Sequence, residues 1–333
     1  MKKIFIFLSR MNKMILYYFS FFAILAIVVL ISSREIIMTP WTAREWISAT
    51  AESEHIYISG GTDSDNRLCE NIFHIDLEKK TIKTIGNLPT PRYSTVSAYK
   101  EPYVYIAGGC DNEGYLDEIV RFNPHEKISD IYVRFDEPRC YGAMVNIGNS
   151  LYYIGGFNGK EVVDTILKIN TDTGKITETS KLKTPINFHS SVALNGNILI
   201  IGGENDKGNR VTDIYEIDPE TGEILRSGNL PVALIRSTAS LWENQLYIVG
   251  GWGEGGSRNE IIRVDLNDPV LTSEIIGYLP QKSSDKSLIS YGSELFLIGG
   301  AEERFLRQIK VIKYKPESGF SESLKLQSYP WWH

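Results

Sequence analysis

Four arginines recur along the chain at comparable points of an internal repeat, and their guanidinium groups could bind carboxylates. A guanidinium holds a carboxylate through two parallel hydrogen bonds, so arginines gathered at one mouth would suit a sugar acid or acidic side chains. The alternative is structural, because Arg after Pro, as in TPRY and EPRC, can hydrogen-bond carbonyls between neighbouring repeats. Both interpretations stay open. The four residues are Arg44, Arg92, Arg139 and Arg236.

A tryptophan in a glycine-rich loop is a further candidate. Trp252 lies in GGWGEGGSRNE, where the glycines leave one ring face open. Such a residue suits stacking on a sugar or anchoring a protein interface, and the alternative is a cap over its own repeat. Other chemistries lack their residues: the five histidines show no clustered spacing, and G-x-S-x-G, phosphate-loop and paired-cysteine zinc motifs do not occur. We therefore expect no metal and no cofactor.

Six hydrophobic runs that each end in Gly-Gly are the elements that must position these residues. Successive diglycines are 48, 47, 47, 48 and 49 residues apart, which indicates a repeat architecture. Each repeat continues with a polar loop, a third apolar stretch and a turn rich in Pro, Asp, Thr and Gly, so that four short strands fill it. The diglycines are Gly60 and Gly61, Gly108 and Gly109, Gly155 and Gly156, Gly202 and Gly203, Gly250 and Gly251, and Gly299 and Gly300.

Six four-stranded repeats packed radially predict an all-β, six-bladed β-propeller. Diglycines fit near the central shaft, where a Cβ would clash. In such a blade, the loop before the first strand and the loop between the second and third strands share one face. We therefore expect the four arginines, Glu204 and Trp252 to form a ligand-binding mouth. The expected blade boundaries lie near Arg92, Arg139, Asn187, Arg236 and Ser284.

The end of the repeat array is expected to complete its own blade. Ser321 to Gln327 supplies a fourth strand for the last repeat. An N-terminal strand is thus not required for closure, although Arg34 to Met38 resembles an orphan fourth strand that could add to the edge.

The chain resembles the kelch-repeat family from about Arg44 to Trp332. The repeats GGFNGKEVVDTILKIN and GGENDKGNRVTDIYEIDPETGEI are especially similar to the family pattern, although Ile or Phe stands where the family usually has Trp. The resemblance implies a propeller of a kind that hosts enzymes and binding modules alike.

A more distant resemblance, to the sialic-acid mutarotase/epimerases of the same family, concerns Glu204 and Arg210. It implies that Glu204 moves a proton and that Arg210 holds the sugar carboxylate. Those enzymes carry long insertions that are absent here, and the loop sequence ENDKGNR is also ordinary for a solvated loop.

Residues 14–32 predict a transmembrane signal-anchor helix. The run from Met14 to Ile31 contains no charge, and eighteen residues of helix cover about 27 Å. Four Lys or Arg residues precede it, so residues 1–13 should stay cytoplasmic and the propeller should lie in the periplasm or at the cell surface. A cleaved signal peptide is the alternative, but the exit VLISSRE lacks a small-x-small site. Residues 33–43 form a linker and 44–333 the propeller.

Composition and cysteine count limit the partners. The net charge is −6 with mixed signs, so nucleic acid is not expected as a partner. Three cysteines in 333 residues exclude a disulfide framework. Cys110 follows a diglycine and Cys140 opens the next repeat, so these two could be spatial neighbours or simply free buried residues.

The sequence as a whole predicts a membrane-tethered, outward-facing kelch propeller that binds a carbohydrate or protein partner. The alternatives are a sugar-acid mutarotase or epimerase that uses Glu204 and Arg210, and a structural subunit of a membrane complex.

Overall fold

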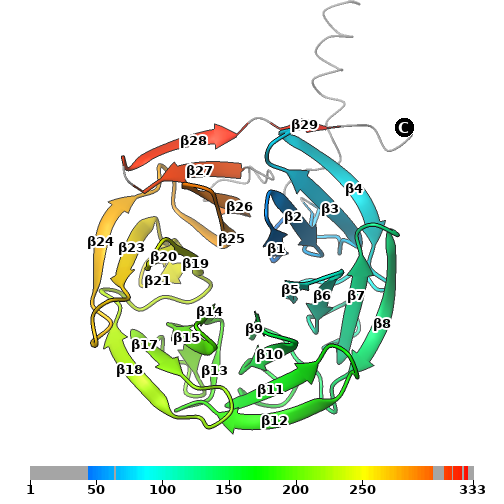
Figure 1. Ribbon diagram of the computed structural model, residues 1–333, viewed down its shortest axis with the longest axis horizontal. Coiled ribbons are helices and arrows are strands. Elements are labelled where there is room, and N and C mark those ends of the chain that lie inside the picture. Colours follow the sequence, from blue (N-terminus) through cyan, green and yellow to red (C-terminus); the bar gives the residue numbers. More distant parts are fainter. Residues whose placement is uncertain (1–43, 64, 303–310, 317, 325, 329–333) are drawn as a thin grey trace, which may run out of the picture. The chain divides into compact units, whose positions relative to one another are not determined.

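Each repeat forms one antiparallel blade of four strands in sequence order, and six blades surround a central shaft (Figure 1). The computed structural model describes residues 44–333 except 64, 303–310, 317, 325 and 329–333. The six-bladed propeller predicted from the diglycine spacing is confirmed, and the blade boundaries fall near the expected residues.

The strands of the first three blades are β1 (Ser48–Glu52), β2 (His55–Ser59), β3 (Asn71–Asp76) and β4 (Thr81–Asn87); β5 (Val96–Lys100), β6 (Tyr103–Ala107), β7 (Glu118–Asn123) and β8 (Ile128–Arg134); and β9 (Ala143–Ile147), β10 (Ser150–Ile154), β11 (Thr165–Asn170) and β12 (Ile176–Lys181).

The strands of the last three blades are β14 (Ser190–Leu194), β15 (Asn197–Ile201), β17 (Asp213–Ile217) and β18 (Ile224–Asn229); β19 (Thr238–Trp242), β20 (Gln245–Val249), β23 (Glu260–Asp265) and β24 (Ser273–Tyr278); and β25 (Ser283–Tyr291), β26 (Glu294–Glu302), β27 (Val311–Lys315) and β28 (Phe320–Leu324). Short strands in the loops and at the seam are β13 (Ile186–Asn187), β16 (Glu204–Asn205), β21 (Trp252–Gly253), β22 (Gly256–Ser257) and β29 (Gln327–Ser328).

The hydrophobic core lies between the blades. In β6, Val104 and Ile106 pack against Tyr57 of the first blade, whereas Tyr105 packs against Tyr153 of the third. Successive side chains of a strand point to opposite faces, so each inner strand serves two interfaces. This is why the sequence before each diglycine is a continuous apolar run rather than an alternating one.

The diglycines join neighbouring blades through the backbone. The amide of Gly109 donates a hydrogen bond of 2.8 Å to the carbonyl of Arg139, at the start of the next blade. Gly108 has a φ of +59°, and a Cβ there would overlap the same carbonyl oxygen. A residue with a side chain would therefore be strained and would push the blades apart. The same bond recurs at 2.8–2.9 Å from Gly61 to Arg92, Gly156 to Ile186, Gly203 to Leu234 and Gly251 to Ser283.

The seam between the last and first blades differs from the expectation. The fourth strand of the last blade, β28, ends at Leu324, and Gln327 belongs instead to β29. Strand β29 pairs in parallel with β4, Gln327 opposite Thr81 and Ser328 opposite Ile82, so the sheet of the first blade has five strands (Figure 1). The proposed contribution of Arg34 to Met38 lies outside the described residues.

The expected anchor (14–32) and linker (33–43) also lie outside the described residues. Over the part of the chain that is described, no helix has the length and apolar character needed to cross a membrane.

The diglycine geometry predicts that Gly108→Ala destabilises the protein far more than Gly148→Ala does. Gly148 has a φ of +61° but nothing within 4 Å of a Cβ, so it carries only the strain of about 1 kcal/mol. Gly108→Ala adds the overlap with the Arg139 carbonyl, and we expect a total loss of at least about 3 kcal/mol in the free energy of unfolding. Urea unfolding of both variants measures the difference, and equal losses would contradict the interblade explanation.

Candidate functional site

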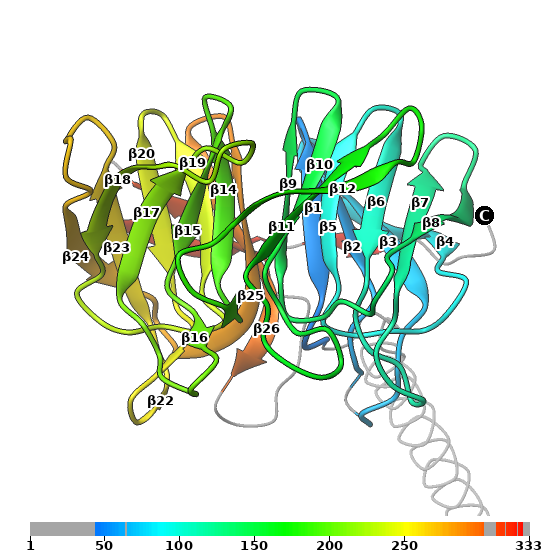
Figure 2. The ribbon, with the colours of Figure 1, turned by 90° about the horizontal axis from the view of Figure 1, so that it is seen from below.

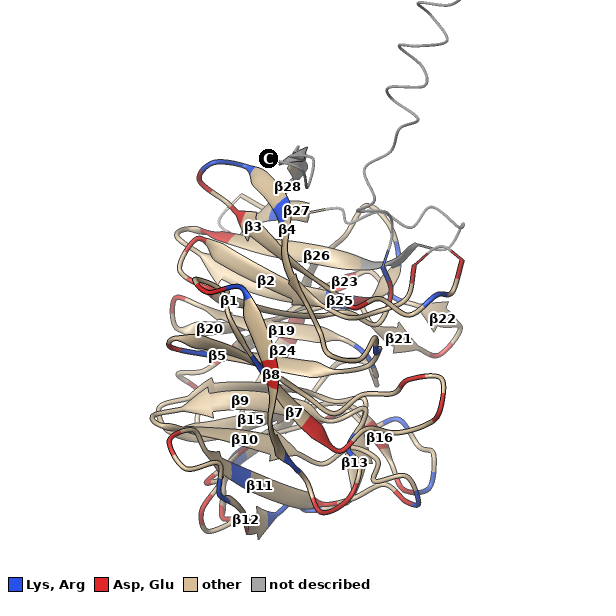
Figure 3. Ribbon diagram, turned by 90° about the vertical axis from the view of Figure 1, so that its right-hand side faces the viewer, with Lys and Arg blue, Asp and Glu red and all other residues tan. Residues whose placement is uncertain are grey.

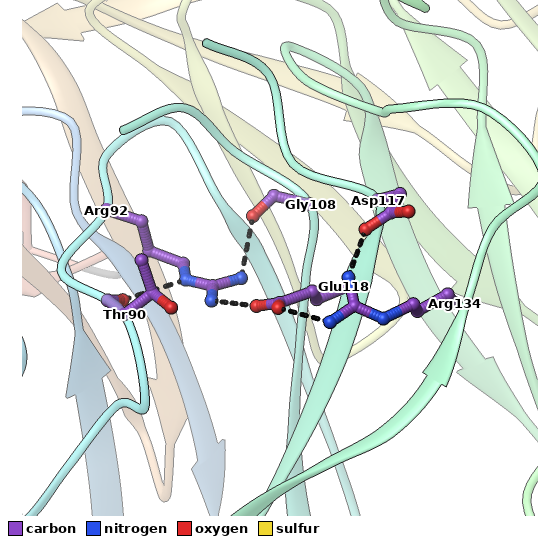
Figure 4. A network of polar contacts seen from close by, with 6 residues as sticks. All are labelled: Thr90, Arg92, Gly108, Asp117, Glu118 and Arg134. Atoms are coloured by element: carbon purple, nitrogen blue, oxygen red, sulfur yellow. Dashed lines mark hydrogen bonds and ion pairs between the residues drawn. The ribbon is translucent and has the colours of Figure 1, made fainter. Parts of the chain in front are cut away.

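Arg92 is buried at the junction of the first two blades. Its side chain is 0 % exposed, donates to the carbonyls of Thr90 (3.0 Å) and Gly108 (3.4 Å), and forms an ion pair with Glu118 (Figure 4). Glu118 is also held by Arg134 at 2.8 Å. The Arg92 carbonyl meanwhile accepts the diglycine bond of the first blade. One residue therefore links two blades through its backbone and its side chain.

Arg44 is also turned inward in the first blade, with Asn71 at the position that Glu118 holds in the second. Its guanidinium donates to the carbonyls of Gly60 and Asn71, both at 3.2 Å, and to the Asn71 side chain at 3.0 Å. It also lies 4.3 Å from the centroid of the Phe73 ring. Burial lowers the pKa of Arg44, partly offset by Cys69 and Asp63. These contacts leave its guanidinium turned into the protein.

Arg139 occupies the same position but has weaker partners. It donates to the Pro138 carbonyl at 3.1 Å and lies 3.6 Å from Glu137, while its buried Nε has no partner among the described residues. Thr165 stands at the start of β11, where Glu118 stands in β7. Arg139 also borders a groove of about 680 Å³ between the second and third blades. The geometry of Arg44 and Arg92, and less fully of Arg139, fits the structural alternative.

Six residues in the left-handed region of φ line the mouth of the shaft, one from each blade. Each stands fourteen residues before the first glycine of its repeat, with φ between 53° and 59°. This backbone costs large side chains about 1–2 kcal/mol each, and it recurs at the same point of every repeat. We call the six residues the mouth ring: Trp46, Ser94, Tyr141, Phe188, Arg236 and Asp285.

The mouth ring surrounds a cavity of about 140 Å³. The Arg236 guanidinium lies 4.0 Å from the centroid of the Trp46 ring and 4.8 Å from that of Phe188. The rings of Tyr141 and Phe188 are 4.4 Å apart. The Nε atom of Arg236 is buried and has no hydrogen-bond partner within the described part of the chain. A cation resting on aromatic faces with an unpaired N–H can accept an anionic group.

An acidic residue completes the ring. Burial raises the pKa of Asp285, while Arg236 and a 2.7 Å hydrogen bond from Ser284 act in the opposite direction and Glu45 adds to the rise. The ring thus offers aromatic faces, a cation and a carboxyl group within one small mouth.

Several buried polar atoms lie at or next to the ring without partners in the described structure. Both ring nitrogens of His189 are unpaired, as is the hydroxyl of Ser94. His189 is 6 % exposed, and burial lowers its pKa to about 4, so it is neutral at pH 7. Buried polar groups in native proteins normally find a protein or water partner, so these atoms are available to water or to a polar guest.

Glu204 and Arg210 lie opposite each other in one small loop but are not ion-paired in the described structure. They are antiparallel backbone bridge partners, and β16 pairs with β13. Arg210 is exposed and borders a groove of about 670 Å³ together with Glu254 and Arg258. Trp252 is 39 % exposed in the β21–β22 hairpin, which projects from the same end of the propeller as β16 (Figure 2).

The sequence prediction placed only Arg236 in the mouth ring. Arg236 stands two positions later in its repeat than Arg44, Arg92 and Arg139. The sequence prediction treated the four arginines as equivalent and did not use this difference. Five ring residues were missed: Trp46, Ser94, Tyr141, Phe188 and Asp285. The sequence did mark this position. The residue fourteen places before each diglycine is of a different type in every repeat, whereas the diglycines themselves do not vary.

Charges on the described blades are mixed. Both Lys or Arg and Asp or Glu are scattered over the loops and strands on the side seen in Figure 3. No group of three His, Cys, Asp or Glu side chains in the described residues converges on a point that could hold a metal ion.

Comparisons with known proteins agree with this architecture. The model of the KLHDC2/KLHL20/DRC7 Kelch-repeats domain matches residues 30–181 and 141–319. Kelch-like protein 41a of Danio rerio is 23% identical over 222 residues, 63% of this chain and 36% of that protein. Spermatocyte protein spe-26 of Caenorhabditis elegans is 24% identical over 209 residues, 59% of this chain and 35% of that protein. The chain thus spans about a third of the length of these relatives.

A solved structure titled "Structure of YjhT" has a similar fold. It superposes with a TM-score of 0.72 at 15% identity, and the match covers 85% of this chain and 99% of that one. At this identity the likeness concerns the fold alone.

The Arg92 network predicts a large structural effect of Arg92→Ala. The substitution leaves Glu118 buried with Arg134 as its remaining ion-pair partner, and we expect a loss of about 3–5 kcal/mol in the free energy of unfolding. Arg139→Ala should cost about 1–2 kcal/mol, because it removes fewer bonds. Arg67→Ala, at a side chain 76% exposed, is the control and should cost less than about 0.5 kcal/mol. An unchanged melting temperature of the Arg92 variant would contradict the structural role.

Proposed function

We propose that this chain, which belongs to the kelch-repeat family, is an interaction module that recognises a protein partner at the mouth ring. The family match supports the class of domain. The mouth ring is the observation that supports the location of the binding site. Kelch domains are typically interaction modules, and a fold that hosts many activities needs a site-level argument.

The chemistry of the ring supports a partner that brings an acidic group beside an apolar one. Arg236 would bind the carboxylate. The rings of Trp46 and Phe188, which lie against the Arg236 guanidinium, would hold that guanidinium in place. Rings and arginines of this kind dominate the energetics of protein interfaces. Trp252 and Glu204, in loops at the same end, would extend the contact beyond the ring.

A carbohydrate is the other kind of partner that could bind the mouth ring, and the binding arrays described below distinguish the two. Aromatic faces also stack on sugars, and a sugar acid would present the same carboxylate to Arg236. We favour a protein partner because the ring cavity, about 140 Å³, is small for an enclosed sugar and suits one inserted side chain.

A sugar-acid mutarotase or epimerase is the second candidate function. The observation in its favour is that Glu204 and Arg210 are direct bridge partners and that Arg210 borders an open groove. In this proposal Glu204 would transfer the proton and Arg210 would hold the substrate carboxylate. A structural subunit of a membrane complex, the third alternative, would bind no free ligand at the ring.

We also propose that residues 14–32 anchor the protein in a membrane with the propeller outside. The support is the uncharged run from Met14 to Ile31 and the basic residues before it.

Arg236→Ala should weaken partner binding by about 1.5–3 kcal/mol, roughly 10- to 150-fold, the range for a hydrogen bond to a charged group. Arg236→Lys keeps the charge but loses the planar fork, so it should recover only part of the affinity. The partner is identified first on arrays of acidic peptides and of sialylated glycans, and the dissociation constant is then measured by calorimetry.

Arg263→Ala is the matched control for Arg236→Ala. Arg263 lies in β23 of the same blade, is 44% exposed and pairs with Glu274. Its loss should leave the affinity unchanged. Equal affinities of wild type and Arg236→Ala would contradict binding at the ring. Anomerisation of a sialic acid that is lost in Glu204→Gln, followed by NMR, would favour the enzymatic alternative.

Protease added outside intact cells should digest the propeller and leave a short membrane-bound stub. Immunoblotting with antibodies against each end of the chain follows both products. A soluble mature protein that begins near Arg34 would show instead that the apolar run is a cleaved signal.

A further inference from the structure

Cys110 and Cys140 face each other across the junction of the second and third blades. Their sulfur atoms are 3.1 Å apart, and the two residues are 2 % and 0 % exposed. Cys110 directly follows the diglycine of its blade, and Cys140 directly follows the acceptor of that diglycine's hydrogen bond. The sequence left open whether these two cysteines are neighbours, and the structure places them side by side at the point where two blades are joined.

The backbone holds both cysteines in position. Cys110 exchanges two hydrogen bonds of 2.9 Å with Tyr93, and Cys140 exchanges bonds of 3.0 and 2.8 Å with Phe157. Between them runs the 2.8 Å bond from Gly109 to Arg139. A disulfide needs sulfurs about 2.05 Å apart, so closing this pair requires side-chain movement of about 1 Å.

We propose that Cys110 and Cys140 are a redox pair that closes into a disulfide between the second and third blades. Among the six equivalent junctions, this is the one where cysteines stand at both positions. Cys69, the remaining cysteine, contacts the Arg67 carbonyl at 3.7 Å and takes no part.

The oxidant is another disulfide, either of low molecular weight or in a thiol–disulfide oxidoreductase. The Cys110 thiolate attacks one sulfur of that disulfide, forms a mixed disulfide and expels one thiolate. Cys140 gives up its proton and attacks the Cys110 sulfur, which releases the second thiol. Two thiols thus become one disulfide, and the oxidant takes up two electrons and two protons.

The two thiols differ in a way that fits this order. The hydrogen bond from Cys140 lowers the pKa of Cys110, whereas burial raises the pKa of Cys140. Because both sulfurs are buried, the reaction requires the junction to open or the blades to be still docking, and the finished bond is shielded from reductants.

The disulfide would also stiffen the mouth ring. Tyr141, a ring residue, follows Cys140 directly, and its hydroxyl lies 3.9 Å from the Cys110 sulfur. A covalent bond at this point fixes the backbone from which Tyr141 projects toward the shaft.

The test counts thiols in the full chain after incubation with glutathione disulfide, both on the folded protein and during refolding of the reduced chain. Alkylation under denaturing conditions followed by mass spectrometry should find one free thiol, at Cys69, and three after dithiothreitol. Closing a loop of 30 residues should raise the melting temperature by about 5–10 °C.

Cys69→Ser is the matched control and should retain the whole shift in melting temperature, whereas Cys110→Ser should abolish it. Peptide mapping of the wild-type protein gives the answer even if that variant folds poorly. Three free thiols both in the folded protein and after refolding, or a disulfide that joins two chains, would overturn the proposal.

Discussion

The hydrogen bond from the second glycine of a blade to a carbonyl at the start of the next blade is the constraint on which this structure depends. It brings two backbones together so closely that Gly108 can carry no side chain. It also fixes the position of everything that follows the acceptor. Arg139 accepts the bond, Cys140 comes next, and Tyr141 then enters the mouth ring. The same contact therefore joins neighbouring blades and sets where the side chains of the mouth ring begin.

This constraint separates two kinds of arginine that look alike in the sequence. Arg92 accepts the interblade bond and turns its guanidinium inward to Glu118, where an unpaired charge would be costly. Arg236, two positions further on in its repeat, has a left-handed backbone and lies across the aromatic rings of the mouth. The backbone repeats sixfold, but the side chains of the ring do not. The repeated backbone thus accounts for the joining of the blades, and the side chains that vary give the mouth its distinct chemistry.

The diglycine spacing was enough to predict the blades, because a period of nearly 48 residues and a turn after every apolar stretch admit few other folds. The mouth was harder to predict. Trp46 and Arg236 are four blades apart in the sequence and meet only across the shaft. The left-handed φ of a residue such as Phe188 cannot be predicted from its type, because glycine and asparagine are the residues that usually indicate this conformation. Arg92 and Arg139 differ in burial partners because Glu118 in one blade is replaced by Thr165 in the next.

The pairing of β29 with β4 has a consequence for how the protein is made. A ribosome delivers the chain in order, and Ser328 appears roughly 250 residues after Ile82, which at usual elongation rates is on the order of ten to fifty seconds. Throughout that interval Thr81 and Ile82 of β4 lack the strand that later pairs with them. Unpaired backbone groups at a strand edge can hydrogen-bond with strands of other chains. The pairing of the first blade with the end of the chain is therefore a step that waits until synthesis is nearly complete.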